Sequence, residues 1–215
     1  MKKTISITTL FLFLTTGYAD EGIYTFEKNN NVFFYSKNAD KVLQLTHTGK
    51  NSNPILSPDG RWLVFVKQSK IIMPERCTDF SNIDSKYANE LWVYDLQNMK
   101  KRILVKDNFA CDDPEKKITD PEQLYFSPNS KTLYFQTSAW ATSGAIHAID
   151  MDSKNPRFVT DGNEYHVIKD GKYKGDLVIN QHRYRFKGDT PLGSYDWDWL
   201  YTPQGKQIKL YKKED

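Results

Sequence analysis

The chain has 215 residues, of which 39% are hydrophobic, 14% aromatic and 27% charged. At this length a single domain with a sizeable core is expected. The 30 lysine and arginine residues nearly balance the 27 aspartate and glutamate residues, which leaves no electrostatic basis for binding nucleic acid.

The N-terminal segment has the three parts of a secretory signal peptide. Lys2 and Lys3 precede an apolar stretch from Ile5 to Leu14, and the small residues Gly17 and Ala19 follow at the third-last and last places before a cleavage site. The apolar stretch is shorter than the roughly 20 residues of a membrane-spanning helix. We therefore expect it to be removed rather than kept as an anchor.

Cleavage after Ala19 would leave 28 basic and 27 acidic residues, a net charge of about +1. We predict that residues 1–19 are the signal peptide and that residues 20–215 form one domain. This domain is expected to be periplasmic or secreted, with no membrane anchor after cleavage.

A tight turn recurs between two apolar runs. It occurs in NPILSPDGRWLVFVK, Asn53 to Lys67, and again in QLYFSPNSKTLYFQ, Gln123 to Gln136. Pro58 fixes its own φ and Gly60 accepts a positive φ, which suits a hairpin turn. The aromatic and β-branched residues that follow are typical of strands. A weaker third copy, YHVIKDGKYKGDLVIN, runs from Tyr165 to Asn180.

A second hairpin type alternates with the first, in NVFFYSKNADKVLQLTH, NELWVYDLQNMKKRILVK and GAIHAIDMDSKNPRFVTD. The turns at Asn129 and Asp170 are 41 residues apart, and those at Asp59 and Asn129 are 70 apart. The longer spacing shortens to a similar value if the polar stretch from Ser69 to Asn89 is an insertion. A repeat of about 42 residues with four strands is typical of a β-propeller blade.

The pattern predicts an all-β fold, a small β-propeller of about four blades. One blade is partial, at about 23–49, and the others are at about 53–107, 121–161 and 163–215. Neighbouring blades would stack face to face. Two arrangements remain open: a closed four-bladed ring, or an open arc completed by a second chain. An immunoglobulin-like sandwich is a weaker alternative, because it would not explain a turn that recurs at the same place in each unit.

These residues also carry a family resemblance. The pattern P-x-x-SPDG-x-x-x-x-F, followed by LWVYD and a short RxL strand, resembles the TolB-type, WD-like β-propeller repeat of exported bacterial proteins, over residues 23–168. The resemblance implies the fold and says little about function. Such repeats occur in colicin-import partners, in propeller domains of peptidases and in orphan periplasmic proteins.

The two cysteines, Cys77 and Cys111, are predicted to form a disulfide. An exported protein enters an oxidising compartment, where such bridges persist. Cys77 lies in the insertion after the second strand of a blade, and Cys111 follows the fourth strand of the same blade, so both connections reach one rim. Their spacing is not that of a zinc site, and the sequence predicts neither a metal nor a cofactor.

The same rim is expected to carry the long irregular segments, where recognition usually occurs. These segments are Ser69 to Asn89, Asp107 to Asp120, the stretch around Trp140, and Gln181 to Gly193. Tryptophan, tyrosine and arginine are enriched at interface hot spots, although each could singly be a core or solvated residue. The predicted partner-binding residues are Trp140, His182, Arg183, Tyr184 and Arg185.

No catalytic motif such as G-x-S-x-G or H-E-x-x-H is present. The leading hypothesis is a non-enzymatic, exported module that binds a protein partner, with an immunity or inhibitor role as one version. The alternative is a propeller enzyme that acts on a glycan or a peptide through residues of the central channel, with His182 and Asp196 as the groups to test. The sequence leaves the oligomeric state open.

Overall fold

The computed structural model describes residues 22–77 and 87–211, and the predicted signal peptide at residues 1–19 lies outside the described residues. Within these ranges the chain forms fifteen β-strands, one short 3-10 helix and no α-helix. The predicted all-β class is therefore confirmed.

The strands form four antiparallel sheets, and in each sheet the strands pair in chain order. The first sheet has three strands: β1 (Ile23–Lys28), β2 (Asn31–Ser36) and β3 (Lys41–Gln44). The second has four: β4 (Asn51–Leu56), β5 (Trp62–Ile72), β6 (Tyr87–Asp95) and β7 (Lys100–Val105). The third has β8 (Glu122–Phe126), β9 (Thr132–Ser138), β10 (Gly144–Asp150) and β11 (Arg157–Gly162). The fourth has β12 (Glu164–Val167), β13 (Leu177–Lys187), β14 (Thr190–Tyr201) and β15 (Gln207–Leu210).

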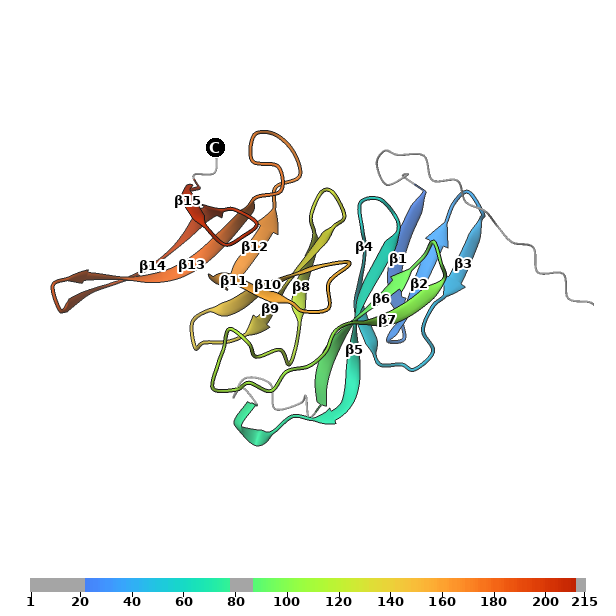
Figure 1. Ribbon diagram of the computed structural model, residues 1–215, viewed down its shortest axis with the longest axis horizontal. Coiled ribbons are helices and arrows are strands. Elements are labelled where there is room, and N and C mark those ends of the chain that lie inside the picture. The colour runs from blue at the N-terminus through green and yellow to red at the C-terminus, as the bar shows by residue number, and fades with distance from the viewer. Residues whose placement is uncertain (1–21, 78–86, 212–215) are drawn as a thin grey trace, which may run out of the picture.

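The sheets are the blades of a propeller. They stand side by side in chain order, with the first and last sheets at opposite ends of the row (Figure 1). The first strands β4, β8 and β12 contact one another in sequence and so line the inner side. Of the two predicted arrangements, the described part of the chain adopts the open arc and does not close a ring by itself.

The first blade is the partial one. Its β2–β3 hairpin resembles the β6–β7 hairpin in sequence and pairing, so β1 corresponds to β5. The innermost strand, which β4 supplies in the second sheet, is therefore absent from the first sheet within residues 22–77 and 87–211.

The core lies between adjacent sheets. Strand β5 is buried on both faces: Leu63 and Phe65 pack toward the first sheet, and Val64 and Val66 pack toward the third. This two-sided burial explains why the run WLVFV is continuously apolar rather than alternating. A third cluster, between the third and fourth sheets, includes Tyr134, Ile146, Leu177, Ile179 and Tyr201.

The recurring turn has the same hydrogen bonds in both good copies. The amide of Gly60 donates to the Ser57 carbonyl at 2.8 Å, and that of Ser130 donates to the Ser127 carbonyl at 2.9 Å. Gly60 has φ +72° and Ser130 has φ +61°, so the second copy holds a non-glycine residue in the left-handed region that favours glycine. The amide of Asp59 also donates to Ser130 Oγ at 3.0 Å, which links neighbouring turns on the inner side of the arc.

Candidate functional site

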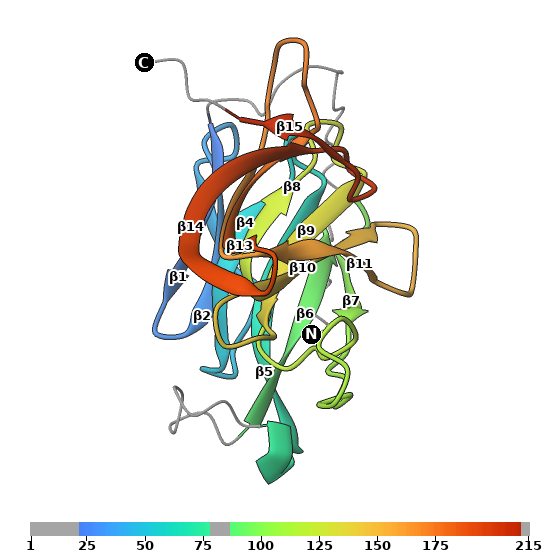
Figure 2. The same ribbon diagram turned by 90° about the vertical axis from the view of Figure 1, so that its left-hand side faces the viewer.

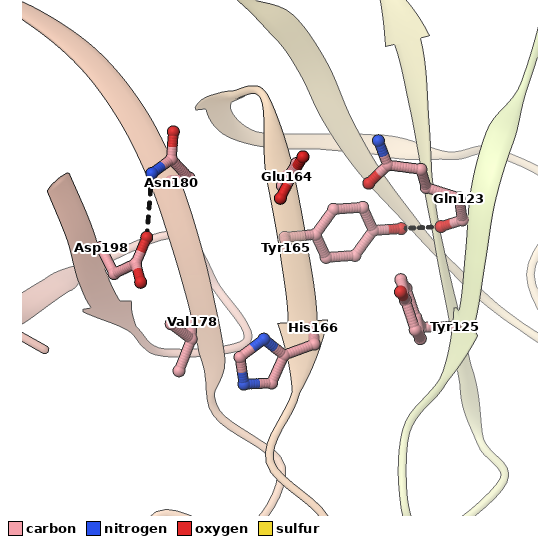
Figure 3. Close-up of a pocket in the computed structure, with 8 residues that line it drawn as sticks. All are labelled: Gln123, Tyr125, Glu164, Tyr165, His166, Val178, Asn180 and Asp198. Carbon is pink, nitrogen blue, oxygen red and sulfur yellow. Dashed lines mark hydrogen bonds between the residues drawn. The ribbon is translucent and has the colours of Figure 1, made fainter. Parts of the chain in front are cut away.

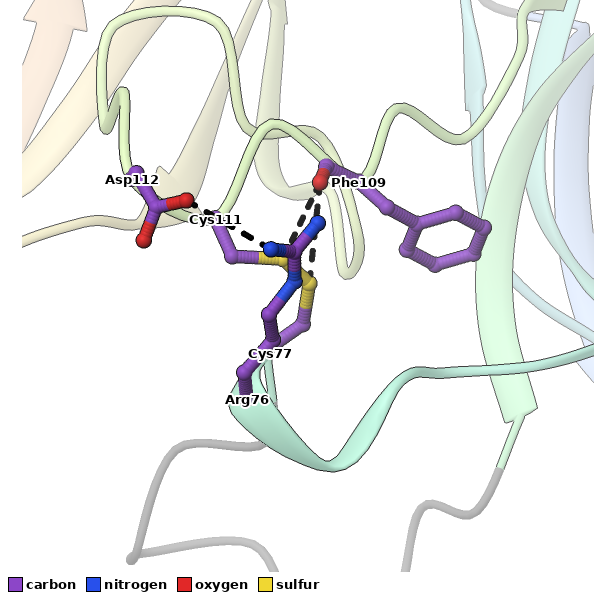
Figure 4. Close-up of a disulfide and its surroundings, with 5 residues drawn as sticks. All are labelled: Arg76, Cys77, Phe109, Cys111 and Asp112. Atoms are coloured by element: carbon purple, nitrogen blue, oxygen red, sulfur yellow. Dashed lines mark hydrogen bonds and ion pairs between the residues drawn. A yellow bond between two sulfur atoms is a disulfide. The ribbon is translucent and has the colours of Figure 1, made fainter.

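A disulfide joins two connections on one rim of the arc. Cys77 ends the 3-10 helix η1 (Glu75–Cys77) after β5, and Cys111 lies between β7 and β8. The two residues are bonded, with their Cα atoms 5.1 Å apart (Figure 4). An exposed ion pair between Arg76 and Asp112, with an N–O distance of 3.6 Å, lies beside the bridge. The predicted disulfide is therefore present, and both connections reach the same rim.

A long hairpin projects from the fourth sheet. Strands β13 and β14 have 11 and 12 residues, whereas the flanking strands β12 and β15 have four each. Residues 181–198 therefore extend past the sheet as a two-stranded hairpin, here called the arm, which stands clear of the body and curves along its length (Figures 1 and 2). The prediction of an irregular loop over Gln181 to Gly193 was wrong, because these residues continue β13 and begin β14.

One face of the arm is a ladder of arginine and aromatic side chains, here called the arginine face. The guanidinium of Arg183 lies 4.2 Å from the ring centre of Trp199. That of Arg185 lies 4.9 Å from Tyr195 and 5.2 Å from Trp197, and the last two rings are 4.3 Å apart. An isolated hairpin is marginally stable in water, and cation–π pairs of this kind contribute about 0.5–1 kcal/mol each at exposed sites. The ladder therefore holds the arm together.

The two arginines differ in how much of their bonding capacity is used. Arg183 is half-buried and donates to Tyr201 Oη at 3.0 Å, to Gln207 Oε1 at 2.6 Å, and to Gln181 Oε1. It is thus bound into the base of the arm. Arg185 is exposed, and in the described part of the chain it has only its aromatic contacts. Its guanidinium is therefore available to an acidic group of a partner.

The opposite face of the arm carries His182, Tyr184 and Phe186, which alternate along β13. His182 Nδ1 lies 2.9 Å from Asp196 Oδ1 on the paired strand, and its ring meets that of Tyr184 edge to face at 5.0 Å. Tyr184 is 57% exposed and Phe186 is 61% exposed. The strand alternation thus separates the predicted residues, with His182 and Tyr184 on one face and Arg185 on the other.

Trp140, the remaining predicted residue, lies in the β9–β10 connection, on the same rim as the arm. Its ring packs edge-on against Phe158 at 6.2 Å and stays partly exposed. The partner-binding role of the five residues stays a prediction. Sequence reasoning missed Tyr195 and Trp197, although the aromatic residue at every second position of SYDWDWLY indicates a strand with one aromatic face.

A pocket of about 400 Å³ lies at the inner edge of the fourth sheet, where Gln123 and Tyr125 of β8 meet side chains on the face of the fourth sheet that points away from the third. Figure 3 shows the carboxylates of Glu164 and Asp198 and the imidazole of His166 from the fourth sheet. Tyr165 Oη donates to the carbonyl of Gln123 at 2.5 Å, and burial raises the pKa of this tyrosine well above its usual value. The pocket therefore has groups that could transfer protons, and none of them was predicted from the sequence.

Among residues 22–77 and 87–211, no group of three or more histidine, cysteine, aspartate or glutamate side chains is placed to hold a metal ion. The described part of the chain also contains no helix that is long and apolar enough to span a membrane.

No protein-family model matches the chain, and no curated protein matches it in sequence. Solved structures do match its fold. Dipeptidyl peptidase 4 of Porphyromonas gingivalis is 14% identical, with a TM-score of 0.61 over 91% of this chain and 31% of that one. The β-propeller domain of the Trilobed protease from Pyrococcus furiosus, described as having an open velcro topology, is 13% identical, with a TM-score of 0.51 over 86% of this chain and 49% of that one.

TolB from Acinetobacter baumannii is 13% identical, with a TM-score of 0.50 over 89% of this chain and 41% of that one. The chain thus spans less than half the length of each of these three proteins. Identities this low show the fold alone. Together with the sheet order, they establish that the chain has a TolB-like, WD-like β-propeller fold.

Proposed function

We propose that the protein is an exported, non-enzymatic module that uses the arginine face of its arm to bind another protein. The observation that carries this proposal is a hairpin that stands clear of the arc and displays Arg185, Tyr195 and Trp197 to solvent. Tryptophan, tyrosine and arginine dominate binding energy at protein interfaces. The cross-strand contacts fix their positions in advance, which lowers the entropy cost of association.

The compartment is part of the proposal. The predicted signal peptide at residues 1–19, the Cys77–Cys111 disulfide and the TolB-like fold all fit a periplasmic or secreted protein. An immunity or inhibitor role against a toxin or hydrolase that reaches this compartment is one concrete version. The predicted export and the lack of a G-x-S-x-G or H-E-x-x-H motif in the sequence support that version.

The inner pocket favours one alternative function. Glu164, His166 and Asp198 are acid–base groups gathered beside a cavity of about 400 Å³, as an enzyme acting on a glycan or a peptide would require. The contact between His182 and Asp196 lies on the arm, two residues along each strand from Asn180 and Asp198, and neither residue lines the cavity.

Affinity capture from a periplasmic extract tests the leading proposal. We expect the wild-type protein to retain a specific protein and the double variant Arg185→Ser, Trp197→Ser to lose at least 90% of it. Met99→Ser, which alters an exposed apolar residue in the β6–β7 turn of the opposite rim, should retain it fully. Equal capture by all three proteins would contradict the proposal.

The alternative is tested by turnover. If a glycan or peptide substrate is hydrolysed, Glu164→Gln and Asp198→Asn should abolish the activity, and His182→Ala and Asp196→Ala should leave it intact. The opposite pattern would assign the activity to the arm instead of the pocket.

A further inference from the structure

The first sheet has an apolar face that no part of the described chain covers. This face, here called the end face, is made of the outward side chains of β1, β2 and β3: Tyr24, Phe26, Phe33, Tyr35 and Val42. The rings of Phe26 and Phe33 stack at 5.2 Å, and those of Tyr24 and Tyr35 lie 4.9 Å apart. Tyr24 is 53% exposed and Val42 is 52% exposed. A contiguous patch of this kind marks an interaction surface.

The opposite face of the same sheet shows what normally covers such a patch. There Val32 and Leu45 pack against Leu63 and Phe65 of the second sheet. Each of the three sheet-to-sheet interfaces in the arc is built this way, with the apolar face of one blade laid on the next. The stacking pattern of the molecule therefore predicts another blade on the end face.

A suitable blade stands at the far end of the arc. On the side that points away from the third sheet, the arm carries the exposed apolar side chains Tyr184 and Phe186. Towards the base of the arm the same face is acidic, with Glu164, Asp196 and Asp198 alternating along their strands. The end face in turn carries Lys28, which is exposed and lies in register beyond Phe26 on β1. The apolar side chains of the arm thus match the rings of the end face, and the acidic groups at the base of the arm match the charge of Lys28.

The first and last sheets of one chain lie at opposite ends of the row (Figure 1), so they do not cover one another. We propose that a second copy of this chain covers the end face, with the fourth sheet of each copy stacked on the first sheet of the other. The two surfaces differ, so the contact is heterologous, and a two-fold axis repeats it and closes the assembly. The described parts of two copies supply eight sheets, which lies within the usual range of about four to eight blades per propeller.

This inference does not depend on the proposed function. It uses the Tyr184 side of the arm, whereas the arginine face with Arg185 and Trp197 is on the other side of the same hairpin. Loss of partner capture would therefore leave the self-association unchanged, and loss of self-association would leave the arginine face intact.

Sedimentation of the purified protein over a range of concentrations tests the inference. We expect twice the monomer mass for the wild type. The end-face variant Tyr24→Ser, Val42→Ser and the arm variant Tyr184→Ser, Phe186→Ser should each be monomeric at concentrations where the wild type is paired. All four side chains are more than half exposed, so the variants should fold, and Met99→Ser serves as the matched exposed control.

Mixing the two variants identifies the mode of contact. The arm variant keeps an intact end face and the end-face variant keeps an intact arm, so an equimolar mixture can form one of the two contacts and should regain a dimer at higher concentration. The inference would be overturned if the wild type stays monomeric or if neither variant weakens the dimer. It would also be overturned if the mixture of the two variants never associates. A molecular mass that rises above that of the dimer as the protein concentration increases would contradict the closed ring.

Discussion

Removing the disulfide is expected to lower the free energy of unfolding by a large fraction of its total. Cys77 and Cys111 are separated by 34 positions, and closing a loop of this length in the unfolded chain corresponds to about 4 kcal/mol in the chain-entropy model. Typical domains are stable by only about 5–15 kcal/mol. The double variant Cys77→Ser, Cys111→Ser should therefore unfold at clearly lower denaturant concentration, with a melting temperature lower by about 10 °C.

Urea titration measures this loss, with chemical reduction as the internal control. The reduced wild type should match the double variant, because both lack the same cross-link, and adding a reductant to the variant should change nothing. A loss below about 1 kcal/mol would refute the reasoning, since it would mean that the bridge does not constrain the unfolded chain. A variant much less stable than the reduced wild type would instead assign the effect to the packing of the nearly buried Cys77.

Three further predictions concern the interior and the arm. Burial lowers the pKa of His147 to about 4, below its unfolded value of about 6.5. As the pH is lowered, the unfolded state therefore takes up the proton first, and the free energy of unfolding should fall by about 3 kcal/mol between pH 6.5 and pH 4. His147→Gln should remove this pH dependence in urea titrations. Gly205→Ala should destabilise by more than about 2 kcal/mol, because its Cβ would lie 2.1 Å from the carbonyl oxygen of Val159. Gly171→Ala has a similarly positive φ but open space and should cost only about 1 kcal/mol in thermal melts. Arg183→Met should leave global stability nearly unchanged but raise hydrogen exchange in the arm amides.

Local sequence patterns were sufficient to predict the blades. The turn at Pro58 and Gly60 and its repeat at Ser130 are short-range signals, because each depends on backbone angles and hydrogen bonds within a few residues. The sheets begin at residues 23, 51, 122 and 164, within two residues of the predicted starts. The disulfide was also predictable, since alternate connections of a meander must emerge on the same rim.

The open arc could not be derived in this way. Whether a ring closes depends on the angle between successive sheets, which is set by side-chain packing across each interface rather than by any local pattern. The first sheet shows this: its outward rings at Phe33 and Tyr35 look like core residues in the sequence, and because the sheet stands at one end of the row (Figure 1), no part of the described chain covers them.

The arm and the pocket escaped prediction for different physical reasons. The charged residues with Gly188, Pro191 and Gly193 indicated a loop, but the pairing of Arg183 and Arg185 with aromatic rings on β14 stabilises an extended hairpin. The pocket combines residues from β8, β12, β13 and β14, and residues so distant in sequence meet only after the third and fourth sheets have stacked.

The central claim, that the arginine face binds another protein, is tested most directly in cells that export the protein. A photo-crosslinking amino acid at the position of Trp197 should give one discrete adduct with a second protein after illumination, and the same group at the position of Met99 should give none. No adduct from position 197, or the same adducts from both positions, would contradict the claim.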